Sequence, residues 1–172
     1  MSFLDKIKLS KKLERNIESD LEEFYIAFSE KVSNRTMFFK FEQADIIFNS
    51  DKDLIGFVEK DSFMVRLNHK NRWFKISGFP TIAKGSIEQK GNGINLVCKI
   101  SPINFHFKLY YAILILFLLF TFLGLLTSEG TIKEILIGVG IILFFVVFGL
   151  FIPFFTMQKD VENLYEYMNT RL

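Results

Sequence analysis

The sequence is poor in the residues that build metal, redox and nucleophile sites. It has one cysteine, Cys98, and two histidines, His69 and His106, among 172 residues. One cysteine excludes an intramolecular disulfide framework, and these three residues lack the spacing of metal ligands. No complete dinucleotide fingerprint or phosphate-binding loop occurs either. We therefore expect no enzyme activity, no cofactor and no metal, with Cys98 as a buried structural thiol.

Charged residues are missing from two long segments. No Asp, Glu, Lys or Arg occurs in 109–128 or in 135–158. As helices with a rise of about 1.5 Å per residue, these segments would be roughly 30 and 36 Å long, enough to cross the core of a bilayer. The link between them is so short that the two spans must be antiparallel. The sequence therefore predicts a transmembrane hairpin over 108–158 and excludes an ordinary soluble enzyme.

Basic residues flank the open end of this hairpin. Three lysines precede the first span, and Lys159 and Arg171 follow the second. The link between the spans has only Lys133, beside Glu129 and Glu134. Because positive residues near spans stay on the cytoplasmic side, we expect both termini to be cytoplasmic. The predicted location is a bacterial inner membrane, which the chain crosses more than once.

The first 34 residues show helical periodicity. Apolar residues at 9, 13, 17, 21, 24, 28 and 32 recur at spacings of four and three, which predicts an amphipathic helix over 1–34. Its apolar face is expected to cover the domain that follows, and its basic beginning to touch anionic headgroups. The candidate membrane-surface contacts are Lys6, Lys8, Lys11 and Lys12 here, with Lys99 and Lys108 nearer the first span.

The segment 35–107 alternates polar and apolar residues and has frequent turn signals. This pattern predicts about seven antiparallel strands in a small barrel or sandwich, hence a membrane α+β fold class. The tail, 159–172, is expected to be a cytoplasmic helix. The expected strands are 36–41, 44–48, 54–59, 62–67, 73–77, 81–89 and 93–101.

Positive charge is concentrated before the first span. Residues 1–59 contain nine basic and twelve acidic residues, whereas 60–108 contain nine basic and two acidic ones. One interpretation is that these basic residues dock the domain on anionic lipid. The sharper hypothesis is a site for an anionic ligand, such as a lipid phosphate or a nucleotide. Its candidate residues are Arg66, His69, Lys70, Arg72, Trp73 and Lys75.

One segment carries a resemblance. Residues 79–87 read FPTIAKGSI and are followed by a Gly-Asn-Gly turn and an apolar strand that leads into a span. This arrangement resembles a loose group of small bacterial membrane proteins of unknown function, which implies a β domain feeding a hairpin. The architecture is also similar to minimal antiviral effectors, although those place their spans before the barrel.

The sequence leaves three hypotheses open. The first is a non-enzymatic inner-membrane protein whose cytoplasmic β domain binds a protein partner or anionic lipid at the membrane face. The second is an oligomerising effector that disrupts the membrane, with the β domain as its sensor. The third is a small subunit of a larger membrane complex. All three imply contact with the bilayer and a protein partner or a second copy, and none implies nucleic acid.

Overall fold

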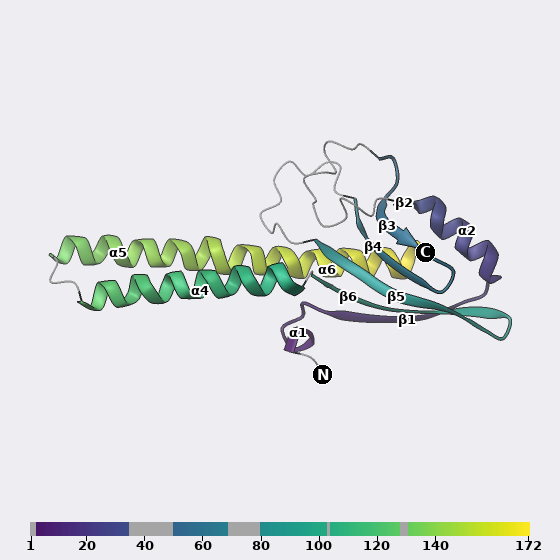
Figure 1. Cartoon of the computed structure of the whole chain (residues 1–172), viewed down its shortest axis with the longest axis horizontal. Coiled ribbons are helices and arrows are strands. Elements are labelled where there is room, and N and C mark those ends of the chain that lie inside the picture. The colour runs from purple at the N-terminus through teal and green to yellow at the C-terminus, as the bar shows by residue number, and fades with distance from the viewer. Residues whose placement is uncertain (1–2, 35–49, 69–79, 103, 128–130) are drawn as a thin grey trace.

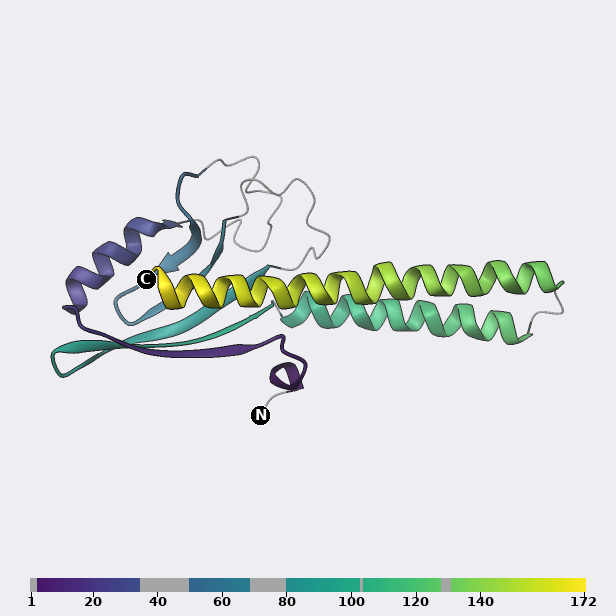
Figure 2. The same ribbon diagram turned by 180° about the vertical axis from the view of Figure 1, so that it is seen from behind.

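The computed structural model describes residues 3–34, 50–68, 80–102, 104–127 and 131–172. These residues form two parts along one long axis: a β-sheet with its covering helices, and a pair of helices that projects from it (Figure 1). The view from behind shows that the longest helix belongs to both parts (Figure 2).

Six strands form one mixed sheet in the order β1-β6-β5-β4-β3-β2. All neighbours are antiparallel except β2 and β3, which are parallel. A tight turn joins β5 to β6, and Gly91 in this turn has a φ of 63°, a conformation that glycine adopts without strain. The strands are β1 (Lys11–Ile17), β2 (Val32–Asn34), β3 (Leu54–Val58), β4 (Ser62–Leu67), β5 (Thr81–Lys90) and β6 (Gly93–Pro102).

The last three helical elements form a single rod. α5 (Ile132–Phe145), the π-helical η1 (Val146–Phe151) and α6 (Ile152–Thr170) follow one another without a break, as a helix of 39 residues. At 1.5 Å per residue this helix is about 58 Å long. The other helices are α1 (Phe3–Lys6), α2 (Leu21–Lys31) and α4 (Asn104–Thr127).

The hydrophobic core lies between one face of the sheet and the helices α2 and α6. Phe28 of α2 packs edge-on against Phe63 of β4, with ring centroids 5.2 Å apart. From α6, Val161, Leu164 and Met168 are buried in the same cluster. We call this the inner face of the sheet. Its buried residues are Leu13, Leu54, Phe63, Val65, Ala83, Ile87, Ile94, Leu96, Cys98 and Ile100.

Helix α4 packs antiparallel along α5 and η1, and two glycines permit the close approach. A Cβ at Gly138 would lie 2.3 Å from the Leu125 side chain, and one at Gly149 would lie 3.0 Å from Leu114. These contacts lie toward opposite ends of the helix pair. A small residue at each point therefore lets the two backbones come close over most of their length.

The predicted helix over 1–34 is wrong in its first half. Residues 11–17 form the edge strand β1, which pairs with β6, and only 21–31 form the helix α2. The spacing of four between Leu9, Leu13 and Ile17 is also a multiple of two, so it places these side chains on one face of a strand as well. Asp20 starts α2 by accepting a hydrogen bond from the Glu22 amide at 2.8 Å.

The sheet matches the prediction only in part. Four expected strands coincide with β3, β4, β5 and β6 to within one residue at each end. The expected strands 36–41, 44–48 and 73–77 lie outside the described residues. Within the described part, the strands form one open mixed sheet rather than an antiparallel barrel or sandwich. The second layer is helical, because α6 covers the inner face; its residues from 159 onward were expected to form a cytoplasmic helical tail.

Candidate functional site

The helix pair exposes an extensive apolar surface. The helix Ile132–Thr170 is long and apolar enough to cross a membrane, and only 6% of its most apolar window is buried by the rest of the chain. A core helix of a soluble domain would instead be covered. Exposed large apolar side chains run along α4 from Leu109 to Leu123, and along the long helix from Ile132 to Phe155. Contiguous apolar patches of this kind mark contact with lipid or protein.

The N-terminal residues clamp the junction between the helix pair and the sheet. Leu4 and Leu9 are buried against Met157 of α6. The Gln158 side-chain amide also donates a hydrogen bond to the Ile7 carbonyl at 2.9 Å. Lys6 and Lys8, two of the candidate membrane contacts, are exposed here. The side chain of Lys108, in the first turns of α4, lies outside the described part.

Two tyrosines of α4 bond the backbone of the long helix at this junction. Pro153 has no amide hydrogen, so it cannot donate a helical hydrogen bond to a carbonyl of η1. The Tyr110 hydroxyl donates to the Gly149 carbonyl at 3.1 Å, and the Tyr111 hydroxyl donates to the Leu150 carbonyl at 3.2 Å. The two hydroxyls therefore fasten α4 to η1.

Lys11, the third candidate membrane contact, points to the inner face. Its ammonium pairs with the Glu162 carboxylate of α6 and lies 4.6 Å from the centre of the Tyr165 ring. Arg15, four residues further along β1, donates to the Asn169 carbonyl at 2.7 Å. These contacts tie the edge strand to α6, so Lys11 does not share a face with Lys12.

The structure brings Lys12 and Lys99 together on the outer face of the sheet. They are opposite one another in the pairing of β1 with β6, and Lys99 is opposite Lys84 of β5. All three side chains are exposed. Sequence reasoning missed Lys84, although the β5–β6 turn fixes the register that pairs it with Lys99. A hollow of about 450 Å³ adjoins the row, lined also by Ser86 and Val97.

The anionic-ligand site expected around Arg66 stays a prediction. Arg66 is 1% exposed, and its guanidinium donates to the Leu67 carbonyl at 3.2 Å. The Arg66 side chain is therefore buried and does not reach the surface. The other candidates, His69, Lys70, Arg72, Trp73 and Lys75, lie outside the described residues.

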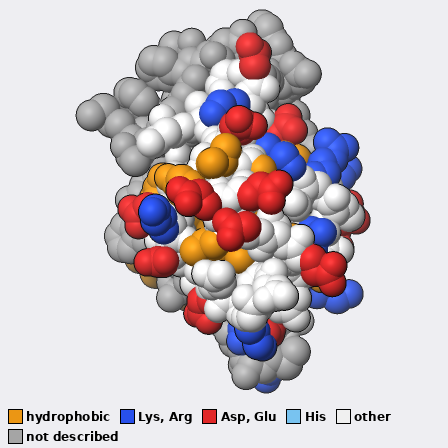
Figure 3. All heavy atoms as spheres, turned by 90° about the vertical axis from the view of Figure 1, so that its right-hand side faces the viewer, with side chains coloured by type: hydrophobic (Ala, Val, Ile, Leu, Met, Phe, Trp, Pro, Cys, Tyr) orange, Lys and Arg blue, Asp and Glu red, His pale blue; other side chains and the backbone are white. Residues whose placement is uncertain are grey.

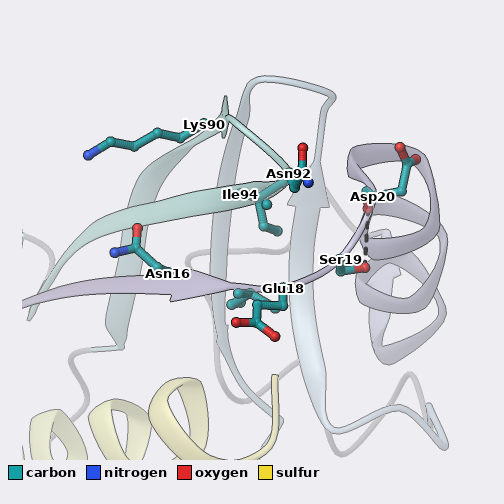
Figure 4. Close-up of a pocket in the computed structure, with 9 residues that line it drawn as sticks. Asn16, Glu18, Ser19, Asp20, Lys90, Asn92 and Ile94 are labelled. Carbon is teal, nitrogen blue, oxygen red and sulfur yellow. Dashed lines mark hydrogen bonds between the residues drawn. The ribbon is translucent and has the colours of Figure 1, made fainter.

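The far end of the sheet has an acidic surface with a second hollow. Seen from that end, acidic side chains gather over the middle of the surface, with small apolar patches among them and basic side chains toward the edges (Figure 3). A hollow of about 710 Å³ lies between the β1–α2 turn and the β5–β6 hairpin. The close-up shows that the charged side chains around the hollow point in different directions (Figure 4). Lys90 points away from Asp20, and Glu18 points to a third side. These charged side chains therefore do not converge on a single atom of a bound ligand.

Two buried side chains of the core, one on β6 and one on α6, have raised pKa values. Burial raises the pKa of the Cys98 thiol to about 11, so it is protonated at neutral pH. Burial, together with the nearby Asp53 carboxylate, raises the pKa of Tyr167 to about 12. The Tyr167 hydroxyl donates to Asp53 at 3.2 Å. Both groups therefore stay neutral and structural at neutral pH.

Neither a metal-ligand cluster in the described residues nor a known relative points to a function. Among the described residues, no group of three or more His, Cys, Asp or Glu could hold a metal ion. No family model matches the chain, and neither a curated protein nor a solved structure matches it. The chain's own geometry is therefore the only basis for a function, and the resemblance at 79–87 stays a hypothesis.

Proposed function

We propose that this chain is a non-enzymatic integral membrane protein whose sheet is fixed at the cytoplasmic membrane face, where it binds an anionic headgroup or a protein partner. One observation carries the proposal: the helix Ile132–Thr170 has an exposed apolar half and a half buried in the core of the sheet. Because one continuous helix belongs to both the helix pair and the core, no flexible linker separates the sheet from the apolar helices. The sheet would therefore keep a fixed distance from the bilayer.

The contacts of α4 support a second span. Its apolar stretch Leu109–Leu125 is shorter than that of the long helix. It nevertheless packs beside α5 near Gly138 and beside η1 near Gly149. If the long helix crosses the bilayer, α4 crosses with it. The described chain begins and ends on the sheet side of the helix pair, which supports placing both termini on one side (Figure 1).

Cysteine accessibility tests this topology. In a Cys98→Ala background, Thr131→Cys places a thiol at the tip of the hairpin, and Thr170→Cys places one at the end of α6. We expect a membrane-impermeant maleimide to label position 131 in intact cells and position 170 only after lysis. Alkaline carbonate should leave the protein in the membrane. Release by carbonate, or labelling of both positions from outside, would contradict the proposal.

The stability of the chain, its oligomeric state and the membrane potential of expressing cells distinguish the binding function from the other two hypotheses. A chain that is stable alone in detergent and does not collapse the membrane potential when overexpressed fits a binding protein. Loss of the potential together with a ring-like oligomer would favour the effector. Degradation of the chain when expressed alone would favour a subunit of a larger complex.

A further inference from the structure

The outer face of the sheet brings three like charges side by side. Residues directly opposite in an antiparallel pair have Cβ atoms about 4.5–5.5 Å apart, and like charges in such pairs destabilise a sheet. Lys12, Lys99 and Lys84 occupy one such row across β1, β6 and β5. Their mutual repulsion opposes folding, and an anion bound between them would relieve it.

Neighbouring side chains leave this charge uncompensated. Within the described part of the chain, none of the three ammonium groups has a carboxylate within 4.0 Å. Glu14 lies on the same face, but its carboxylate accepts a hydrogen bond from the Asn95 amide at 3.5 Å. Protection of an exposed edge strand, a common role of lysine, applies only to Lys12, because β5 and β6 are interior strands.

The lysine row lies beside a hollow and a serine hydroxyl that suit the binding of a phosphate group. The hollow of about 450 Å³ is lined by the three lysines, the Ser86 side chain and Val97. Val97 is 38% exposed, so an apolar surface lies beside the charges. Lysine ammonium groups bind phosphate as point charges, and a serine hydroxyl can donate to a phosphate oxygen. This combination suits a phosphate ester that carries an apolar part.

The row also lies close to the end of the exposed apolar surface. That surface ends on α6 at Phe155, two residues before Met157, which contacts Leu9. Lys12 is three residues beyond Leu9, at most about 10 Å along an extended chain. The headgroup layer is about 5–8 Å thick on each side of a bilayer. Long lysine side chains can reach it, whereas the acidic end of the sheet points away (Figure 3).

We infer that Lys12, Lys84 and Lys99 form a binding site for the phosphate of an anionic phospholipid headgroup. This inference rests on the proposed function, since it needs the apolar surface to lie in the bilayer. The site gives the sheet a fixed rotational orientation on the membrane, because only one of its faces carries the row. Anionic lipid would also stabilise the sheet by removing the repulsion among the lysines.

Lipid binding by the whole protein in neutral detergent tests the inference. The probes are dioctanoyl phosphatidylglycerol, the matched phosphatidylcholine and inorganic phosphate, with bound species measured by native mass spectrometry. The test variant combines Lys12→Gln, Lys84→Gln and Lys99→Gln. The control combines Lys52→Gln, Lys60→Gln and Lys90→Gln, which makes the same charge change at exposed lysines away from the helix pair.

We expect phosphatidylglycerol to bind and phosphatidylcholine not to bind. Each lysine should contribute about fivefold, so the test variant should bind roughly 100-fold more weakly and the control within twofold of the parent. Equal loss in both variants, unchanged binding in the test variant, or equal binding of both lipids would overturn the inference. Inorganic phosphate that binds as tightly as the lipid would assign the site to a free anion instead.

Two further measurements keep the outcome interpretable. Cys98 is buried on the opposite face, so its protection from maleimide shows that a variant is folded. If the triple variant does not fold, the single Lys99→Gln variant replaces it. Carbonate extraction tests the proposed function independently. A protein that resists extraction but ignores phosphatidylglycerol refutes only the lipid site, whereas an extractable protein refutes the membrane function itself.

Discussion

Replacing Leu164 by alanine should unfold the sheet far more readily than the same change on the helix pair. Leu164 is on α6, is 1% exposed and belongs to the main core cluster. Buried leucine-to-alanine changes destabilise a fold by about 2–5 kcal/mol, against a typical total of about 5–15 kcal/mol. The unfolded population of the sheet should therefore rise at least ~30-fold.

The chain has a built-in probe for this measurement. Cys98 is the only cysteine, and it is 3% exposed in the same core as Leu164. A neutral maleimide reacts with this thiol only when the sheet opens, so labelling against urea in bicelles gives the free energy of unfolding. The control is Leu116→Ala on α4, where the side chain is 54% exposed. This control should change stability by less than ~0.5 kcal/mol.

The comparison is decisive because the two variants lose the same atoms from the same residue type. If Leu164→Ala left the urea midpoint of Cys98 labelling unchanged, α6 would not belong to the core. If both variants shifted the midpoint equally, the shift would reflect general damage to the chain rather than loss of a buried contact.

Three further predictions follow from the described contacts. Tyr110→Phe with Tyr111→Phe removes both hydroxyl donors to η1 and should weaken the α4–η1 association by ~1–3 kcal/mol in steric-trap unfolding; an unchanged value would refute their role. Gly138→Leu should disrupt the helix pair by ~1–3 kcal/mol in the same assay, whereas Gly140→Leu, which meets open space, should not; equal effects would contradict this packing. The raised pKa of Tyr167, about 12, contributes stability that is present below pH ~10 and lost as the pH rises toward 12; Tyr167→Phe should flatten that loss in alkaline urea titrations.

Local signals were enough to predict part of the fold. The alternation in 62–67 predicted β4, and the turn at Gly91 correctly separated β5 from β6. The absence of charge likewise predicted the apolar helices, because it depends on composition within one segment. These features are formed by residues close in sequence, so tertiary contacts need not be known to find them.

Features that depend on distant contacts could not be predicted. Leu9, Leu13 and Ile17 fit a helix and a strand equally well, and pairing with β6 decides for the strand. The parallel pairing of β2 with β3 likewise depends on tertiary contacts. The core role of Leu164 could not be predicted, because 159–172 was expected only to be a cytoplasmic helical tail.

The lysine row illustrates the same limit at the candidate site. Lys12 and Lys99 were both expected to contact the membrane, but nothing local places them opposite one another. Their pairing follows from the register of β1 and β6, strands far apart in the sequence. The sequence could have predicted the position of Lys84, because the tight turn at Gly91 fixes the register of the hairpin and pairs Lys84 with Lys99 of β6.

One unbroken helix joins the exposed apolar surface to the core of the sheet. Spin labels at Leu136→Cys in α5 and Glu166→Cys in α6, both exposed positions, test it in liposomes with Cys98→Ala as background. For 30 intervening rises of 1.5 Å, pulsed electron resonance should give one narrow distance distribution near ~45 Å. A broad distribution, or a distance well below that value, would show that the helix breaks between its apolar half and the half packed on the sheet.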